Sequence, residues 1–134
     1  MSAALRLVLA GLVGAAGLQM RITFTESHAE LGPCDDISSC LHGLSLSEVR
    51  IYSGADPMEV QSISNPSGVN PANHPAEKLI DDITTSSKWL DMNFTLTGQS
   101  VLLLDVNDEG GTLTPTGLEL VTGNNPTKRD PVMW

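Results

Sequence analysis

The octapeptide LQMRITFT, residues 18–25, alternates apolar and polar side chains along its whole length. Met20, Ile22 and Phe24 fall on one face, and the residues between them are polar. Because successive side chains of a strand point to opposite faces of a sheet, this period of two predicts a half-buried β-strand.

Similar short apolar segments recur along the rest of the chain, between turn-forming residues. The segment 44–52 (LSLSEVRIY) predicts a strand whose apolar phase slips, which favours a bulge near Ser47 and Glu48. Further strands are expected at 88–94 (KWLDMNF), 101–106 (VLLLDV) and 113–121 (LTPTGLELV), with VLLLDV a continuous apolar run suited to the interior of a sandwich.

The segments between these strands are rich in turn formers. Residues 62–74 and 123–131 are dense in Asn, Pro, Ser and Gly, which predicts two ordered surface loops. The one helical signal is 75–81 (PAEKLID), where a proline suited to a first turn precedes good helix formers. Many short strands with almost no helix predict an all-β antiparallel sandwich or barrel.

The composition of the chain makes some classes of function improbable. The 134 residues, 40% of them hydrophobic, are enough for one domain with a single core. Sixteen acidic residues against seven basic ones give a net charge of -9, which disfavours binding to nucleic acid and to anionic membranes. Only 4% of residues are aromatic, so a large stacking platform for sugars or bases is not expected.

The N-terminus has the pattern of a targeting segment. Arg6 supplies a short positive start, residues 7–18 (LVLAGLVGAAGL) form an apolar run, and the small residues near its end suit a signal peptidase. We therefore predict a signal peptide over 1–17, a domain over 18–134 and a secreted protein. An uncleaved membrane segment, or a buried strand from an upstream domain, stays open as an alternative.

Two cysteines lie close together in a polar segment. In an exported protein the pair Cys34 and Cys40 is expected to form a local disulfide. A metal site with His28 and His42 is the sharper alternative, although the spacing matches no common zinc pattern, and free thiols are the third.

The triplet 93–95 (NFT) makes Asn93 a candidate for N-linked glycosylation. Such triplets also arise by chance. The sequon therefore supports a secretory route only weakly.

Several motifs in series resemble the galactose-binding-like superfamily. Its discoidin domains, also called coagulation factor five/eight type C domains, are the nearest, together with related sugar-binding modules of bacterial glycosidases. The order and spacing of the motifs carry the resemblance, which runs from about residue 18 to the end. The motifs are 46–52 (LSEVRIY), 64–71 (SNPSGVNP), 77–81 (EKLID), 88–91 (KWLD) and 117–125 (GLELVTGNN), followed by 129–131 (RDP) and Trp134.

The resemblance implies an eight-stranded jelly-roll β-sandwich that is not an enzyme and holds its ligand with loops at one end. Many relatives bind glycans, and some bind phospholipid head groups or proteins. This chain departs from the pattern in two ways. Asp82 stands where relatives usually carry glycine, in a turn that is one residue longer. Relatives also continue beyond the position of Trp134, so the domain is expected to be incomplete at its C-terminus.

Polar residues of the two loops are the candidate ligand contacts, because their side chains can donate to sugar hydroxyls or to an anionic group. The alternative is that they serve only turn geometry, or that Arg129 pairs with Asp130. The candidates are Asn70, Asn73, His74, Lys128 and Arg129.

A structural calcium ion is the one cofactor that the resemblance allows, and none is required. Asp81 occupies the position of a carboxylate ligand in many relatives, and Asp82, Thr84 and the backbone around Lys78 could add oxygen ligands. The alternative is that Asp81 braces the turn by accepting hydrogen bonds from backbone amides.

The residues give little support to catalysis. Trp89 lies in an alternating strand, so it is expected in the core rather than in a sugar platform, and Tyr52 and Trp134 are interpreted in the same way. No nucleophile motif, metal-binding histidine pair or glycine-rich phosphate loop is present. The sequence therefore predicts a non-catalytic extracellular module for a glycan or glycoprotein. The alternatives are a protein- or phospholipid-binding domain and a remnant without ligand.

Overall fold

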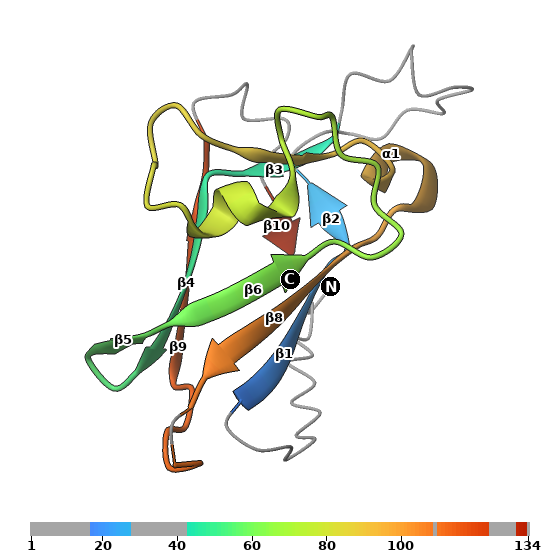
Figure 1. Ribbon diagram of the computed structural model, residues 1–134. Helices are drawn as coiled ribbons and strands as arrows, with labels where there is room; N and C mark the ends of the chain where they lie inside the picture. The colour runs from blue at the N-terminus through green and yellow to red at the C-terminus, as the bar shows by residue number, and fades with distance from the viewer. Residues whose placement is uncertain (1–16, 28–42, 109, 124–130, 134) are drawn as a thin grey trace.

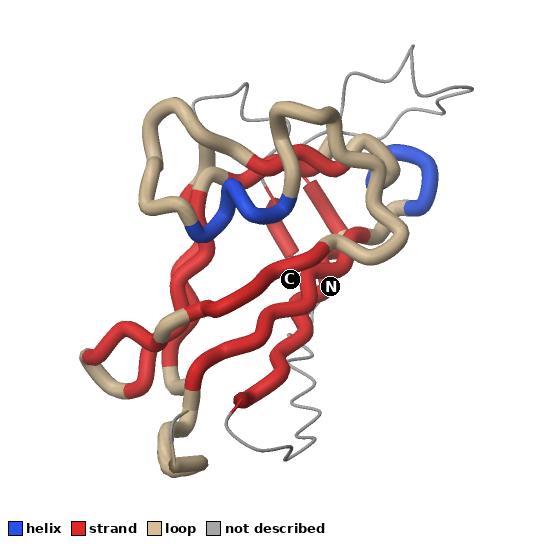
Figure 2. The backbone as a smooth tube through the Cα atoms, viewed as in Figure 1, coloured by secondary structure: helices blue, strands red, loops and turns tan. Residues whose placement is uncertain are grey.

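The protein is seen in a computed structural model that describes residues 17–27, 43–108, 110–123 and 131–133. Strands in antiparallel sheets make up most of it, which confirms the all-β class (Figures 1 and 2). No described helix is long and apolar enough to cross a bilayer. In chain order the elements are β1 (Gly17–Phe24), β2 (Glu26–Ser27), β3 (Leu44–Leu46), β4 (Glu48–Ser53), β5 (Asp56–Met58), β6 (Val60–Ser64), the 3₁₀ helix η1 (Ala76–Ile80), β7 (Trp89–Asp91), α1 (Phe94–Thr97), β8 (Ser100–Asn107), β9 (Gly117–Val121) and β10 (Pro131–Met133).

Strand β8 is the centre of a three-stranded sheet, with β1 and β6 on its two sides (Figure 1). The VLLLDV run forms this strand as predicted, but only alternate side chains are buried. Leu102, Leu104 and Val106 are fully buried, whereas Val101 and Leu103 lie half-buried on the outer face. The period of two applies even to this nearly continuous apolar run, because one face of the sheet is open to solvent.

The predicted irregularity in the second strand is present at Ser47. Upstream of it β3 pairs with β7, and downstream of it β4 pairs with β5 and β9. The backbone N–H of Ser47 still donates to the carbonyl of Val121. The phase slip therefore divides one apolar segment between two sheets, and it places Glu48 at a buried position.

Two predicted strands are shorter than expected. The strand at 88–94 ends at Asp91, because the Asp91 carboxylate accepts the N–H of Asn93 and turns the chain into α1. Phe94 is buried all the same, from the helix. The strand at 113–121 begins only at Gly117, so Pro115 lies in the connection before it.

The sheets and η1 enclose one core. Trp89 is completely buried, as predicted, and its ring lies 6.1 Å from that of Phe24. The prediction for Tyr52 was wrong: its side chain is only half-buried, and its hydroxyl donates to Glu119 at 2.9 Å. A polar partner on the neighbouring strand β9 keeps this ring near the surface. Trp134 lies outside the described residues.

Candidate functional site

Asp91 is the polar centre of one end of the molecule. Its side chain is only 1% exposed. Oδ1 accepts the backbone N–H groups of Val69 and Asn93, each at 3.0 Å, and Oδ2 accepts the hydroxyl of Ser100 at 2.5 Å. The carboxylate therefore joins the loop after β6 to α1 and to the start of β8.

Asparagine side chains attach the same loop to its neighbours. Asn65 donates to the carbonyl of Val101 at 2.8 Å, and Asn93 donates to the carbonyl of Ser67 at 2.8 Å. The amide nitrogen of Asn70 donates both to Oδ1 of Asn65 and to the carbonyl of Leu90. Such side-chain bonds to backbone groups hold the loop in a defined conformation.

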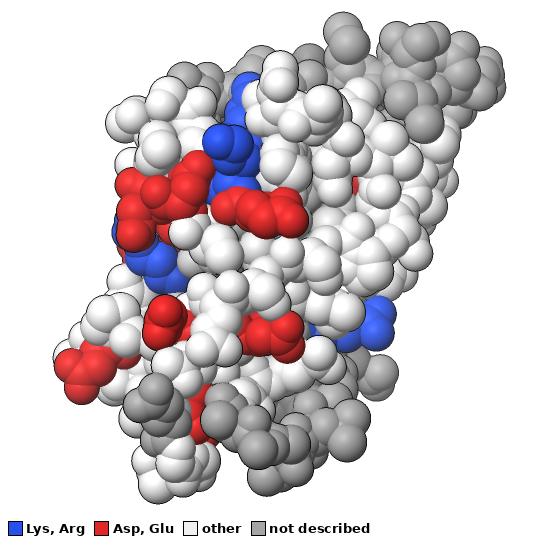
Figure 3. Space-filling model, viewed as in Figure 1, with Lys and Arg blue, Asp and Glu red and all other residues white. Residues whose placement is uncertain are grey.

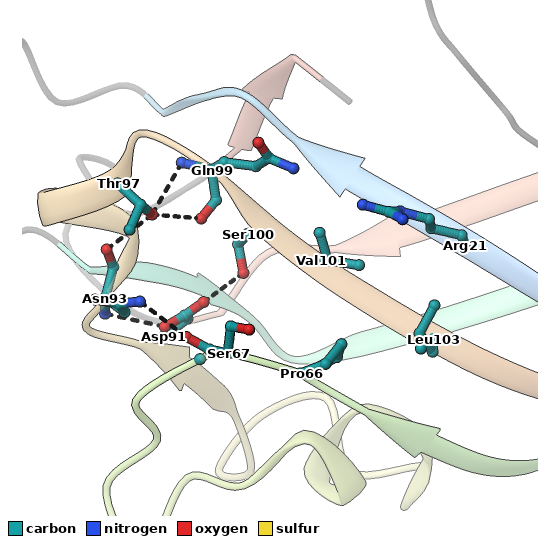
Figure 4. A pocket seen from close by; sticks show the side chains of 11 residues that line it. Arg21, Pro66, Ser67, Asp91, Asn93, Thr97, Gln99, Ser100, Val101 and Leu103 are labelled. Carbon is teal, nitrogen blue, oxygen red and sulfur yellow. Dashed lines mark hydrogen bonds between the residues drawn. The ribbon is translucent and has the colours of Figure 1, made fainter.

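A cavity of about 300 Å³ lies beside this network, on the outer face of the β1-β8-β6 sheet. Figure 4 shows Arg21 and Gln99 on opposite sides of Val101, with their polar ends directed toward one another. Asn93 and Ser67 border the other end of the cavity. The residues that line it are Arg21, Pro66, Ser67, Gly68, Asp91, Asn93, Thr97, Gln99, Ser100, Val101 and Leu103.

The chemistry of this cavity is mixed. Pro66, Val101 and Leu103 supply apolar surface, and Arg21 supplies the one cation of the lining. The Arg21 side chain is exposed, and its Nε makes one long hydrogen bond of 3.4 Å to the hydroxyl of Thr23. A small hydroxylated or anionic ligand could be held here by hydrogen bonds over an apolar floor.

The candidate ligand contacts predicted from the sequence were five polar residues of the two loops. Asn70 is half-buried with its donors used by the fold, and Asn73 is exposed. Nδ1 of His74 is buried without a hydrogen-bond partner among the described residues. None of the three lines the cavity. Lys128 and Arg129 lie outside the described residues, and ligand contact by all five stays a prediction.

Sequence reasoning did not single out Arg21 or Gln99. Arg21 was recognised only as a residue on the polar face of a strand, and its position opposite Leu103 depends on the pairing of β1 with β8. Residues far apart in sequence form this site, so only the strand register could have revealed it.

The Asp81 carboxylate braces the turn after η1. Oδ1 of Asp81 accepts the N–H of Ile83 at 3.0 Å, Oδ2 accepts the hydroxyl of Ser87 at 2.5 Å, and Lys78 Nζ lies 3.7 Å from Oδ2. Thr84 is half-buried. In the described part of the chain no three His, Cys, Asp or Glu side chains converge to hold a metal ion.

These contacts match the alternative to calcium binding given above, in which Asp81 stabilises the turn by accepting hydrogen bonds. Calcium takes six or more oxygen ligands, and both Asp81 oxygens already have partners within the protein. Calcium binding at this turn stays a prediction.

Asp82 has φ of 59°, in the left-handed region where glycine is favoured. We expect Asp82→Gly to raise the free energy of unfolding by about 0.5 to 1 kcal/mol, because the relief of backbone strain exceeds the entropy cost of glycine. Asp81→Gly should instead lose about 1 to 2 kcal/mol with its turn-bracing bonds. Urea unfolding of both variants is the measurement, and equal effects of the two changes would contradict this account.

Most of the sequence features that predict secretion lie outside the described residues. Cys34 and Cys40, with His28 and His42, lie there, as do residues 1–16 of the predicted signal peptide. Asn93 is described: it is half-buried, and its amide donates to Ser67. Glycosylation at Asn93 stays a prediction, and it would replace one of the two hydrogens on the amide nitrogen that makes this bond.

The described residues thus define an all-β protein with a cavity of mixed polar and apolar lining on the outer face of one sheet. Comparison with protein-family models, with curated proteins and with solved structures found no match to the chain.

Proposed function

We propose that this chain is a non-catalytic, secreted recognition domain of the galactose-binding-like type, with a jelly-roll sandwich, and that it binds carbohydrate. The observation that carries the proposal is the 300 Å³ cavity, whose neutral donors and single arginine surround a small apolar floor. Sugars present hydroxyl groups around apolar ring faces, so this combination suits them.

The acid in the cavity supports binding rather than hydrolysis. Asp91 is the only carboxylate of the lining, and its oxygens are engaged by Val69, Asn93 and Ser100. Glycoside hydrolysis ordinarily uses two carboxyl groups on opposite sides of the scissile bond. The lining does not provide such a pair.

Weak binding is expected, because no aromatic ring lines the cavity and an exposed hydrogen bond contributes only about 1 kcal/mol. After a glycan screen, titration calorimetry on the best sugar should show a Kd of roughly millimolar order. Arg21→Ala should weaken this binding about tenfold, since charged hydrogen bonds contribute about 1.5 kcal/mol or more.

Asn73→Ala is the matched control, because Asn73 is exposed on the same loop system but does not line the cavity. Its Kd should change less than about twofold. Loss of binding in Asn73→Ala with no change in Arg21→Ala would place the ligand on the loop and would contradict the cavity assignment.

Protein or phospholipid binding is the second candidate. Val69 on the loop and Leu96 on α1 are 45% and 49% exposed, and the loop and α1 are joined through the bond from Asn93 to Ser67. Exposed apolar tips are the feature that such partners would contact. Cosedimentation with neutral phosphatidylcholine vesicles that is lost in Val69→Ser with Leu96→Ser, in a protein that binds no sugar, would favour this candidate.

A further inference from the structure

Glu48 is a buried acid without a complete set of partners. Its side chain is 2% exposed, at the start of β4, where the phase slip at Ser47 turns it away from solvent. Oε2 has no hydrogen-bond partner among the described residues. A buried carboxylate oxygen without a partner is costly, so a native structure that retains one calls for a functional explanation.

Glu48 lines a second cavity, of about 700 Å³, which runs along β4 between the β5–β6 turn and the end of η1. No residue of this cavity belongs to the lining of the 300 Å³ cavity. Met58, Val60 and Ile80 form apolar walls, while Glu59 and Asp82 are further acids. The cavity therefore combines apolar walls with negative charge.

The basic group of the lining is already occupied. Arg50 lies 3.4 Å from Oε2 of Glu119, which also accepts the hydroxyl of Tyr52. The hydrogen bond that each side chain makes with Glu119 is the main cause that raises its pKa, for Arg50 and for Tyr52 alike. Among the residues that line the cavity, no lysine or arginine therefore forms an ion pair with Glu48.

The charges around Glu48 also favour the binding of a cation. Burial raises the pKa of Glu48 from its usual 4.5, and the negative charges of Asp82 and Asp81 raise it further, against the opposing charge of Arg50 and a backbone hydrogen bond with Asp82. Figure 3 shows acidic side chains at several places on one face of the molecule. The site therefore holds excess negative potential that a bound cation would relieve.

We propose that the 700 Å³ cavity binds a ligand with an ammonium or guanidinium group on a short apolar stem, with Glu48 as its counter-ion. The apolar walls suit the stem, and the unpaired carboxylate oxygen suits the charged head. The cavity is far larger than a metal ion needs, and no three metal-ligating side chains converge in the described residues. A free amine and a lysine or arginine side chain of a protein share this chemistry.

The test is an NMR titration of the full chain with n-butylammonium and, in parallel, with N-acetyl-lysine methylamide. Amide resonances of Val49, Met58 and Asp82 should shift with both probes. Glu48→Gln should weaken binding at least about tenfold, since a charged hydrogen bond is lost. Asp105→Asn removes the same charge on the outer face of the β1-β8-β6 sheet, and it should change the Kd less than about twofold.

The relative affinity of the two probes separates the sources, because tighter binding of the blocked lysine would indicate a protein side chain and equal binding a free amine. Equal weakening in Glu48→Gln and Asp105→Asn would reduce the effect to net charge and overturn the proposal. Saturation by calcium alone, with no response to either amine, would also overturn it, as would an absence of shifts around the cavity. The melting temperature of Glu48→Gln, measured beside the titration, verifies that this variant is folded.

Discussion

Replacing Asp91 by alanine should lower the free energy of unfolding by about 3 to 5 kcal/mol, the largest single effect expected outside the apolar core. The change removes the acceptor for two backbone N–H groups, those of Val69 and Asn93, and for the hydroxyl of Ser100. Because Asp91 is 1% exposed, water cannot easily replace the carboxylate, and these donors are left without partners.

Asp105→Ala provides the matched comparison. Asp105 also accepts two side-chain hydrogen bonds, from Gln19 and Ser62, but it is exposed on the outer face of β8. Its loss should be below about 1 kcal/mol. Equilibrium unfolding in guanidinium chloride measures both variants. A small effect at Asp91, or equal effects at the two positions, would show that the buried network does not hold this end of the fold together.

The second large effect concerns Glu48 and depends on pH. Since the pKa of Glu48 is raised in the folded state from its usual 4.5, the folded protein holds this proton more tightly than the unfolded chain. The contribution of Glu48 to stability should therefore be fully present below about pH 4.5, and it should be lost as the pH rises through the folded-state pKa of this group.

Glu48→Gln removes the ionisation while keeping the shape of the side chain. At neutral pH we expect this variant to be more stable than the wild type by about 1 to 3 kcal/mol, because it lacks a buried charge of which one oxygen has no partner. At pH 4 the difference should nearly vanish. Thermal unfolding at a series of pH values, with Asp105→Asn as the charge-matched control, measures it. A variant that is less stable than the wild type at neutral pH would contradict the assignment of Glu48 as an unpaired acid.

Local sequence patterns predicted the strands best where one face of a strand is buried. The alternation around Ile22 and Phe24, and the phase slip at Ser47, report directly on which side chains the core requires. The prediction was wrong where a polar side chain ends a strand. At Asp91 the carboxylate accepts the backbone N–H of Asn93, and this contact overrides the apolar alternation that continues to Phe94.

The candidate sites were less accessible to sequence reasoning. Asn70 has the residue type and loop position of a ligand contact, but its donors bond to Asn65 and Leu90, which lie 5 and 20 residues away in the chain. Arg21 and Glu48 gain their environments only when distant strands pair. Residue type and spacing indicate which ligands a side chain can bind. The tertiary contacts decide which of its donors and acceptors remain available for binding.

The most direct test of the proposed function is to map the bound sugar by NMR on the wild-type chain, through changes in backbone amide shifts during titration with the best ligand from a glycan screen. We expect saturable shifts at Ser67, Asn93, Gln99 and Val101 around the 300 Å³ cavity, and no comparable shifts at Asn73. Saturable shifts confined to residues outside this cavity, or no response to any sugar that the screen retains, would contradict it.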